Sequence, residues 1–489
     1  MARARGLVME KVTDMKQHNK KVLCVWSAAA VLASLLAGCA VGPDYRAPDA
    51  SSAPASFKEA APEGWKSASP ADSELKGEWW RMYGDPVLND LEARVVSGNQ
   101  TVAQYVASFE KAAALVSEYE ASLYPAVNAG ASGSRSRQSG RTGNSVSLTA
   151  SLSWELDLWG KLRRQVTEEK ALAQAAEADL ANAALSAQAS LARNYFTLRS
   201  LDERIALYEE TIRAYESNVR VLQNKYRSGA VVKSDLTQAE QSLYSARSSK
   251  ASLEAERAQY EHAIAVLTGR APAEFSLPAS ASALPAVPAV PAGVPSRLLE
   301  RRPDIASAER SMAAANEEIG IAIAGYYPDL TLTGETGYSG SRLSHFVNAP
   351  HFLWSLGASA AAPLFDAGKT SSRVRQAKAD YEKSVASYRE TVLEAFQGVE
   401  DYLAAARLLE REIEQSERGL QAAAETARVK SSQYAEGMID YTDVYTSETT
   451  RLSSQQSLIS LKADALVNSV RLIEALGGGW EGLGKARER

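Results

Sequence analysis

The 489-residue sequence contains little cysteine and little histidine, with only two of the former and four of the latter. Cys24 lies in an N-terminal segment that we expect to be removed, which leaves Cys39 without a partner for an intrachain disulfide. The histidines do not have the spacing of metal ligands, and no P-loop, Rossmann or nucleophile-elbow motif is present. The sequence therefore predicts a protein that is not an enzyme and that needs no metal or cofactor.

The chain also lacks a basic tract and, after its N-terminus, a long apolar run. The formal net charge is −5 without a cluster of lysines or arginines, which argues against a nucleic-acid partner. After residue 38 no stretch approaches the roughly 18 apolar residues that a membrane-spanning helix needs. If the mature protein crosses a membrane, we expect it to do so as a β-barrel.

The N-terminus has the pattern of a bacterial lipoprotein signal. A lysine-containing region precedes the apolar segment 22–37, which is short for a spanning helix. Leu36-Ala37-Gly38-Cys39 follows it as a lipobox, which predicts cleavage before Cys39 and acylation of its thiol. Ala40, directly after the cysteine, favours sorting to the outer membrane. The alternative is a buried cysteine behind an uncleaved anchor.

The mature sequence repeats itself at a distance of 208 residues. Five pairs of positions show this: Gly160 and Gly368, Tyr226 and Tyr434, Gly229 and Gly437, Asp235 and Asp443, and Gly269 and Gly477. Each unit is far longer than a solenoid repeat, so we interpret the pattern as a duplicated half-protein. The predicted segments are a signal peptide (1–38), a lipidated tether (39–78), a first repeat (79–280), a Pro-rich linker (281–297), a second repeat (298–480) and a tail (481–489). Met1 and Met15 are both candidate start residues.

Each repeat contains a segment with the two-residue period of a β-hairpin. Residues 146–158 alternate without a break between apolar and polar side chains, which is typical of a strand that crosses an outer membrane with its apolar side toward lipid. The expected partner strand is 126–137, across a turn at 138–144. The hairpin 124–158 of the first repeat corresponds to a hairpin at 328–365 in the second. The alternative for these strands is a soluble β-sandwich.

Long stretches without proline predict unusually long helices. Sixty-eight residues separate Gly160 from Gly229, and another 68 separate Gly368 from Gly437. A helix of that length measures roughly 100 Å. We expect helices over 161–228, 230–268, 369–436 and 438–476, and a shorter helix before each hairpin.

The number of strands predicts an oligomer. Four strands cannot close a barrel, and an open sheet edge in lipid leaves backbone groups unpaired. Two copies would supply eight strands and three would supply twelve, which begin to leave space inside. The residues thus indicate a channel with long helices attached to it, and they leave the number of copies open.

Two sequence strings and the helix-turn sequences resemble a known family. Residues 39–45 (CAVGPDY) and 295–305 (PSRLLERRPDI) are similar to the lipidated outer-membrane factors of the TolC, OprM and NodT type. The resemblance implies a mixed α+β membrane protein, in which a trimeric 12-stranded outer-membrane β-barrel with four strands per chain continues into a long periplasmic α-helical barrel. It also implies a periplasmic adaptor and an inner-membrane pump of the RND type as partners.

The function implied by the resemblance is that of an exit duct. Such a duct carries drugs or other small toxic compounds from a tripartite efflux pump through the outer membrane. A type I protein-secretion duct and a structural coiled-coil surface lipoprotein are the alternatives.

The resemblance also assigns a periplasmic gate to the two helix turns at Gly229 and Gly437. It implies that Tyr434 hydrogen-bonds Asp235 and that copies of Asp443 form a ring of carboxylates near the axis. Two family positions differ, because an arginine is replaced by Ile439 and a second carboxylate by Thr446.

Charge near the turns suggests a replacement for the missing arginine. The hypothesis is that Arg227 or Lys233 of the first repeat pairs with Asp440 or Asp443 of the second. The alternative is that these are solvated charges at helix ends.

The turns themselves are the predicted docking site for the adaptor. The residues are Gly229, Ala230 and Val231 in the first repeat and Gly437, Met438 and Ile439 in the second. The alternative role of the two glycines is to end the helices.

Overall fold

The computed structural model describes residues 40–46, 57–58, 77–280, 282–290, 302–342 and 347–478. The predicted signal peptide, Cys39 and most of the tether lie outside the described residues, as does part of the linker. No helix among the described segments is both long and apolar enough to cross a membrane.

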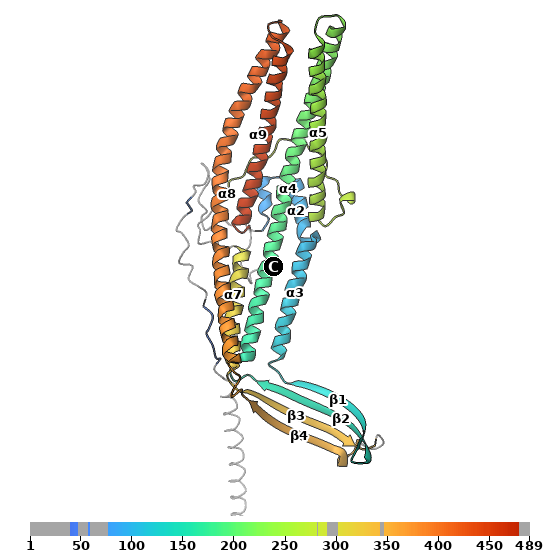
Figure 1. The fold of residues 1–489 in the computed structure, drawn as a ribbon, viewed down its shortest axis with the longest axis vertical. Helices are drawn as coiled ribbons and strands as arrows, with labels where there is room; N and C mark the ends of the chain where they lie inside the picture. The colour runs from blue at the N-terminus through green and yellow to red at the C-terminus, as the bar shows by residue number, and fades with distance from the viewer. Residues whose placement is uncertain are drawn as a thin grey trace, which may run out of the picture. The chain divides into compact units, whose positions relative to one another are not determined.

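The four strands form one antiparallel sheet in the order β1-β2-β3-β4 (Figure 1). The strands are β1 (Ala126–Gln138), β2 (Arg141–Leu156), β3 (Asp329–Gly340) and β4 (Phe352–Ala361). The two hairpins are joined because β2 pairs with β3, from Val146 opposite Gly340 to Leu156 opposite Leu330. The sheet therefore combines segments from both halves of the chain.

The turn between β1 and β2 is shorter than the expected turn at 138–144. Ser139 and Gly140 alone connect the strands, both with positive φ (51° and 82°), which suits the twist of a hairpin. The residues on either side pair in register, from Gln138 opposite Arg141 to Ser134 opposite Ser145. The prediction was wrong because it read these polar residues as a loop, although backbone pairing does not depend on the polarity of the side chains.

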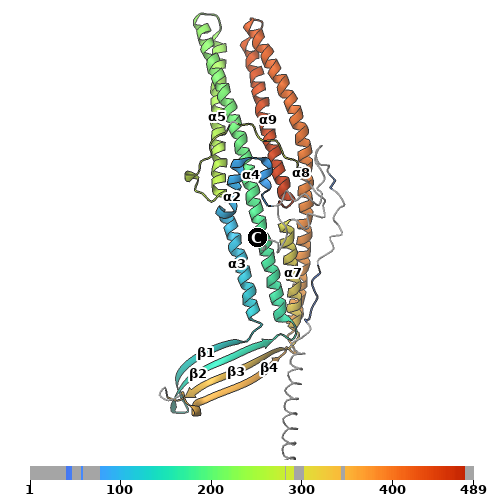
Figure 2. The same ribbon diagram turned by 180° about the vertical axis from the view of Figure 1, so that it is seen from behind.

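Seven α-helices lie within the described segments (Figures 1 and 2). They are α2 (Pro86–Gly98), α3 (Gln100–Ala121), α4 (Lys161–Arg227), α5 (Lys233–Leu267), α7 (Pro303–Ala324), α8 (Lys369–Ala435) and α9 (Tyr441–Ala475). Both α4 and α8 have 67 residues, and both α5 and α9 have 35. The last two begin three residues later than expected, because Val232 and Asp440 before them are extended.

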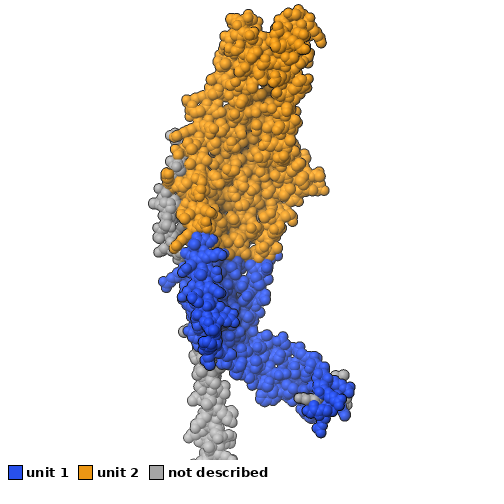
Figure 3. All heavy atoms as spheres, viewed as in Figure 1, with its two compact units in different colours: residues 1–47, 110–174, 309–387 blue, residues 48–109, 175–308, 388–489 orange. Residues whose placement is uncertain are grey.

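Residue contacts divide the chain into two compact units (Figure 3). The first holds the sheet with the adjoining parts of α3, α4, α7 and α8, and it includes residues 40–46. The second holds α2, α5, α9 and the remaining parts of α3, α4, α7 and α8. Its core is built around aromatic and aliphatic side chains such as Trp79, Tyr195, Phe196, Leu198 and Val470.

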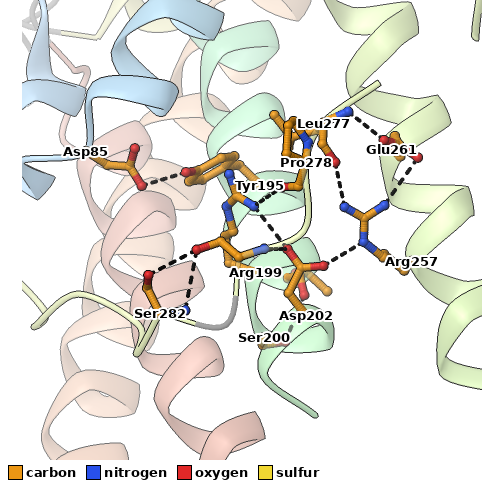
Figure 4. A network of polar contacts seen from close by, with 12 residues as sticks. Asp85, Tyr195, Arg199, Ser200, Asp202, Arg257, Glu261, Leu277, Pro278 and Ser282 are labelled. Carbon is orange, nitrogen blue, oxygen red and sulfur yellow. Dashed lines mark hydrogen bonds and ion pairs between the residues drawn. The ribbon is translucent and has the colours of Figure 1, made fainter. Parts of the chain in front are cut away.

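In the second unit, a polar network attaches the segment after α5 to α4 (Figure 4). The side chain of Asp202 is 1% exposed, and it forms ion pairs with Arg199 at 3.0 Å and with Arg257 at 2.6 Å. Each arginine also donates to a backbone carbonyl of that segment, Arg199 to Pro278 and Arg257 to Leu277. Both arginines thus pair with one buried carboxylate, and Arg257 also pairs with Glu261 at 3.3 Å. The segment is held by hydrogen bonds to its backbone.

Candidate functional site

The first candidate site consists of the two helix turns in the second unit. Gly229 and Gly437 have φ of 76° and 75°, a conformation that glycine adopts without the penalty of a Cβ. In each turn the next residue closes a six-residue loop, with Ala230 N–H donating to Lys225 at 2.8 Å and Met438 N–H donating to Gln433 at 2.9 Å. Both glycines therefore end their helices with the same hydrogen-bond pattern.

An apolar cluster close to the turns packs the two helical hairpins together. Val219, Leu222, Ala239, Leu243 and Tyr441 are buried, and Val231 and Tyr434 pack against them at the edge. Asn218 of α4 also donates a hydrogen bond to the Tyr441 hydroxyl of α9. We name these contacts the tip cluster. It fixes the α4–α5 hairpin against the α8–α9 hairpin within one chain.

Tyr434 contacts an aromatic side chain of the tip cluster and a lysine beside it. Its ring lies 5.6 Å from that of Tyr441 in an edge-on arrangement, and Lys225 Nζ lies 5.5 Å from the ring centroid. Burial, and then the charge of Asp235, raise the pKa of the Tyr434 hydroxyl. Within the described residues no hydrogen bond joins Tyr434 to Asp235, and the two interact through charge.

Asp443 has a cation partner that the sequence reasoning missed. Lys430 Nζ of α8 lies 3.3 Å from Asp443 Oδ1 of α9, and both side chains are partly exposed. Among the described ion pairs, neither Arg227 nor Lys233 contacts Asp440 or Asp443. Within one chain the partner of Asp443 is thus a lysine from the other arm of its own hairpin. The pairing of Arg227 or Lys233 across the two hairpins stays a prediction.

A simple rule would have found this pair. Lys430 is seven residues before Gly437 and Asp443 is six residues after it. In an antiparallel hairpin, residues nearly equidistant from the turn lie opposite one another. Tyr441 and Asn218 had no such signal, since their contact joins two different hairpins.

The expected docking residues differ in exposure. Met438 is 60% exposed and Ala230 is exposed, whereas Val231 packs against the tip cluster. An exposed methionine is a flexible apolar side chain that suits a protein partner. The surface available to a partner is therefore formed mainly by Gly229, Ala230, Gly437 and Met438.

A second region lies in the first unit, where residues 40–46 cross α4 and α7. Arg164, with 6% of its side chain exposed, donates to the Val41 and Gly42 carbonyls at 2.8 and 3.2 Å and pairs with Glu317 at 2.6 Å. Gly42 has φ of 104°, and a Cβ there would lie 2.5 Å from the Gly320 Cα. The string after Cys39 is thus fitted closely to its surroundings.

The end of this string is fixed by Asn316 and Tyr45. Asn316 donates to the Pro43 carbonyl at 3.2 Å, and the Tyr45 hydroxyl donates to Glu309. The Tyr45 ring packs against small residues of the two helices, Ala171, Ala313 and Ala314. We call residues 40–46 the N-terminal strap. Cys39 itself lies outside the described residues.

The described segments contain no group of three or more histidine, cysteine or acidic side chains that could hold a metal ion.

Comparisons with known proteins agree with this geometry. The family model described as outer membrane efflux protein matches residues 93–270 and again 294–478. The antibiotic efflux pump outer membrane protein ArpC of Pseudomonas putida is 30% identical over 472 residues, which cover 94% of this chain and 97% of that relative. The cation efflux system protein CusC of Escherichia coli K12 is 28% identical over 454 residues, with 92% and 98% covered. The solved outer-membrane channel OprN matches with a TM-score of 0.82 at 30% identity, over 91% of this chain and all of that one.

Proposed function

Because the chain belongs to the outer membrane efflux protein family, we propose that it is the exit duct of a tripartite RND-type efflux pump. It would carry drugs or other small toxic compounds from the periplasm and the inner-membrane pump to the exterior. It lies in the outer membrane and extends into the periplasm. A periplasmic adaptor and an inner-membrane RND pump are its proposed protein partners.

One observation carries the proposal: a four-stranded sheet with an exposed apolar face continues into two helices of 67 residues each. Val127 is 69% exposed, Trp354 69% and Leu356 81%. An exposed apolar face of this kind fits lipid, and long helices fit a periplasmic conduit.

The same sheet supports a trimer. The strands β1 and β4 are both edges in a single chain, and an unpaired edge in lipid is costly. Three chains would supply twelve strands and close a barrel around the face that carries serine and threonine. Twelve helices would then form the periplasmic barrel.

We also propose that the chain consists of two internal repeats with the division at 79–280 and 298–480. The family model matches twice, once in each half. The equal lengths of α4 and α8 and of α5 and α9 support the same division. The lipobox supports acylation of Cys39 and anchoring to outer-membrane lipid.

The helix turns are the proposed gate and docking site. Asp443 and Asp440 lie at the start of α9 with Tyr434 across the hairpin, and Asp235 lies at the start of α5. Copies of these carboxylates near a common axis would attract cations. The adaptor would contact the residues of the two turns, which are Gly229, Ala230, Val231, Gly437, Met438 and Ile439.

Deletion of the gene in its native host tests the function. We expect greater sensitivity to several unrelated small toxic compounds, restored by the wild-type chain. Loss of a secreted protein with unchanged drug sensitivity would favour a type I secretion duct. A membrane extract containing only monomers would favour a surface lipoprotein.

A further inference from the structure

The far end of the sheet, where both hairpins turn, carries positive charge only. Residues 126–154 and 336–365 contain no aspartate or glutamate, although the whole chain has a net charge of −5. The same stretches hold four arginines, Arg135, Arg137, Arg141 and Arg342, and all four are exposed. Neither stretch thus holds an acidic side chain that could pair with these arginines.

The strand register shows on which face two of these arginines lie. Residues directly opposite one another in an antiparallel pair project to the same side of the sheet. Val127 lies opposite Leu152, and Gly133 lies opposite Val146, so this side is the apolar face. Arg135 and Arg137 continue the same face, because they follow Gly133 at steps of two.

Arg141 differs from them. It lies opposite Gln138 and shares its face with Ser147, whose hydroxyl bonds the Ser132 hydroxyl at 2.8 Å. That face is polar. Arg141 is therefore on the side that would line water, whereas Arg135 and Arg137 are on the side that would contact lipid.

The second hairpin contributes an arginine to the same end of the sheet. Arg342 and Arg135 line one shallow hollow together with Asn144 and Val146. Just before this hollow, Tyr338 and Phe352 lie opposite one another on the apolar face, with ring centroids 5.6 Å apart. Along the apolar face, aliphatic residues are thus followed by aromatics and then by arginines.

This order matches the layers of a membrane leaflet. Aromatic rings favour the level of the headgroups, and phosphates lie outside the hydrocarbon. Arginine is suited to phosphate because its planar guanidinium can donate two parallel hydrogen bonds. The helices extend into the periplasm, so the hairpin turns are at the outer leaflet, where bacterial outer membranes carry a phosphorylated glycolipid.

We propose that Arg135, Arg137 and Arg342 form a binding site for the phosphate groups of the glycolipid headgroup in the outer leaflet. The inference rests on the proposed function only for the orientation of the sheet in the outer membrane. Because Arg135 and Arg137 continue the apolar face, the site serves the lipid around the protein and does not select the cargo inside it.

The test uses the full-length protein purified in detergent and measures its thermal unfolding with added lipid. The probes are bisphosphorylated lipid A, the same lipid without its phosphates, and inorganic phosphate. We expect bisphosphorylated lipid A to raise the melting temperature of the wild type, and the other two probes to have little effect.

The decisive variant replaces all three arginines (Arg135→Gln, Arg137→Gln and Arg342→Gln), and Arg141→Gln is its matched control on the opposite face. The triple variant should lose the melting-temperature rise, and Arg141→Gln should keep it. If the triple variant does not fold, Arg342→Gln alone should reduce the rise.

Three results would overturn the proposal. They are an equal rise for the triple variant, an equal rise with the dephosphorylated lipid, and an equal rise with inorganic phosphate, which would indicate a free-anion site. Pore conductance of the same preparations separates this outcome from the duct itself. A triple variant that conducts but shows no melting-temperature rise with lipid A supports both proposals. A wild type whose melting temperature rises with lipid A but that does not conduct contradicts only the proposed duct.

Discussion

Lys430 and Asp443 form an ion pair across the second helical hairpin, with 3.3 Å between Nζ and Oδ1. Both side chains are partly exposed, so the pair adds little to stability, on the order of 0–1 kcal/mol. Its effect is on charge instead. While Lys430 is in place, the carboxylate at the proposed gate is compensated within its own chain.

Replacing Lys430 with methionine should therefore increase the preference of the channel for cations. The change leaves one uncompensated Asp443 in each copy, and negative charge at a constriction raises the local concentration of cations. The reversal potential across a salt gradient in planar bilayers measures this. Arg227→Met removes an exposed cation with no described ion pair and is the control. An equal shift for both variants would contradict the assignment of Lys430.

The helix turns should be sensitive to a methyl group. Gly437→Ala places a Cβ in a left-handed conformation, which costs about 1–2 kcal/mol. Gly419→Ala adds the same methyl inside α8, where nothing lies within 4 Å, and should stabilise by about 1 kcal/mol. Denaturant unfolding followed by circular dichroism measures both. Changes of the same sign would argue against the observed turn.

The N-terminal strap depends on Arg164. Arg164→Met should destabilise by about 3 kcal/mol or more, because it leaves Glu317 buried without its cation. Arg375→Met removes an exposed arginine that donates to Ser372 at 3.1 Å, and it should change stability by less than about 0.5 kcal/mol. Limited proteolysis should also cut the strap faster in the first variant. Equal cutting in both would show that the strap is not held through Arg164.

Glu92 should make the second unit sensitive to alkaline pH. The side chain is buried, neither carboxylate oxygen has a hydrogen-bond partner among the described residues, and burial raises its pKa from 4.5 to about 9. A carboxyl whose pKa is raised on folding contributes full stability below its unfolded pKa. That stability decreases as the pH rises through the folded pKa.

Glu92→Gln cannot ionise, so its melting temperature should fall less than that of the wild type between pH 7 and about pH 10. Glu256→Gln, which replaces an exposed carboxylate on α5, is the control and should follow the wild type. A variant that lost stability as steeply as the wild type would show that Glu92 is not the buried titrating group.

The sequence predicted the long helices and both hairpins, because period and the absence of proline are local signals. The predicted turn at 138–144 was too long, because polar residues pair in a strand as well as apolar ones do. The strands are connected by Ser139 and Gly140. The strap was recognised only as a family string. Its partners could not be predicted because Tyr45 and Glu309 are 264 residues apart, and no local pattern links them.

The gate shows a similar division. The turns at Gly229 and Gly437 could be predicted because each glycine lies between two long helical stretches. The pair of Lys430 and Asp443 joins the two arms of one hairpin, whereas the predicted pairs join two different hairpins. Asn218 and Tyr441 meet only through the packing of the hairpins, which depends on the whole tip cluster.

Single-channel recording tests the central claim most directly. The wild-type protein, purified as a heat-resistant trimer and inserted into a planar bilayer, should give discrete conductance steps that become more cation-selective in Lys430→Met. A purified trimer that inserts but never conducts, including in the Lys430→Met variant, would contradict the claim that this chain forms an exit duct.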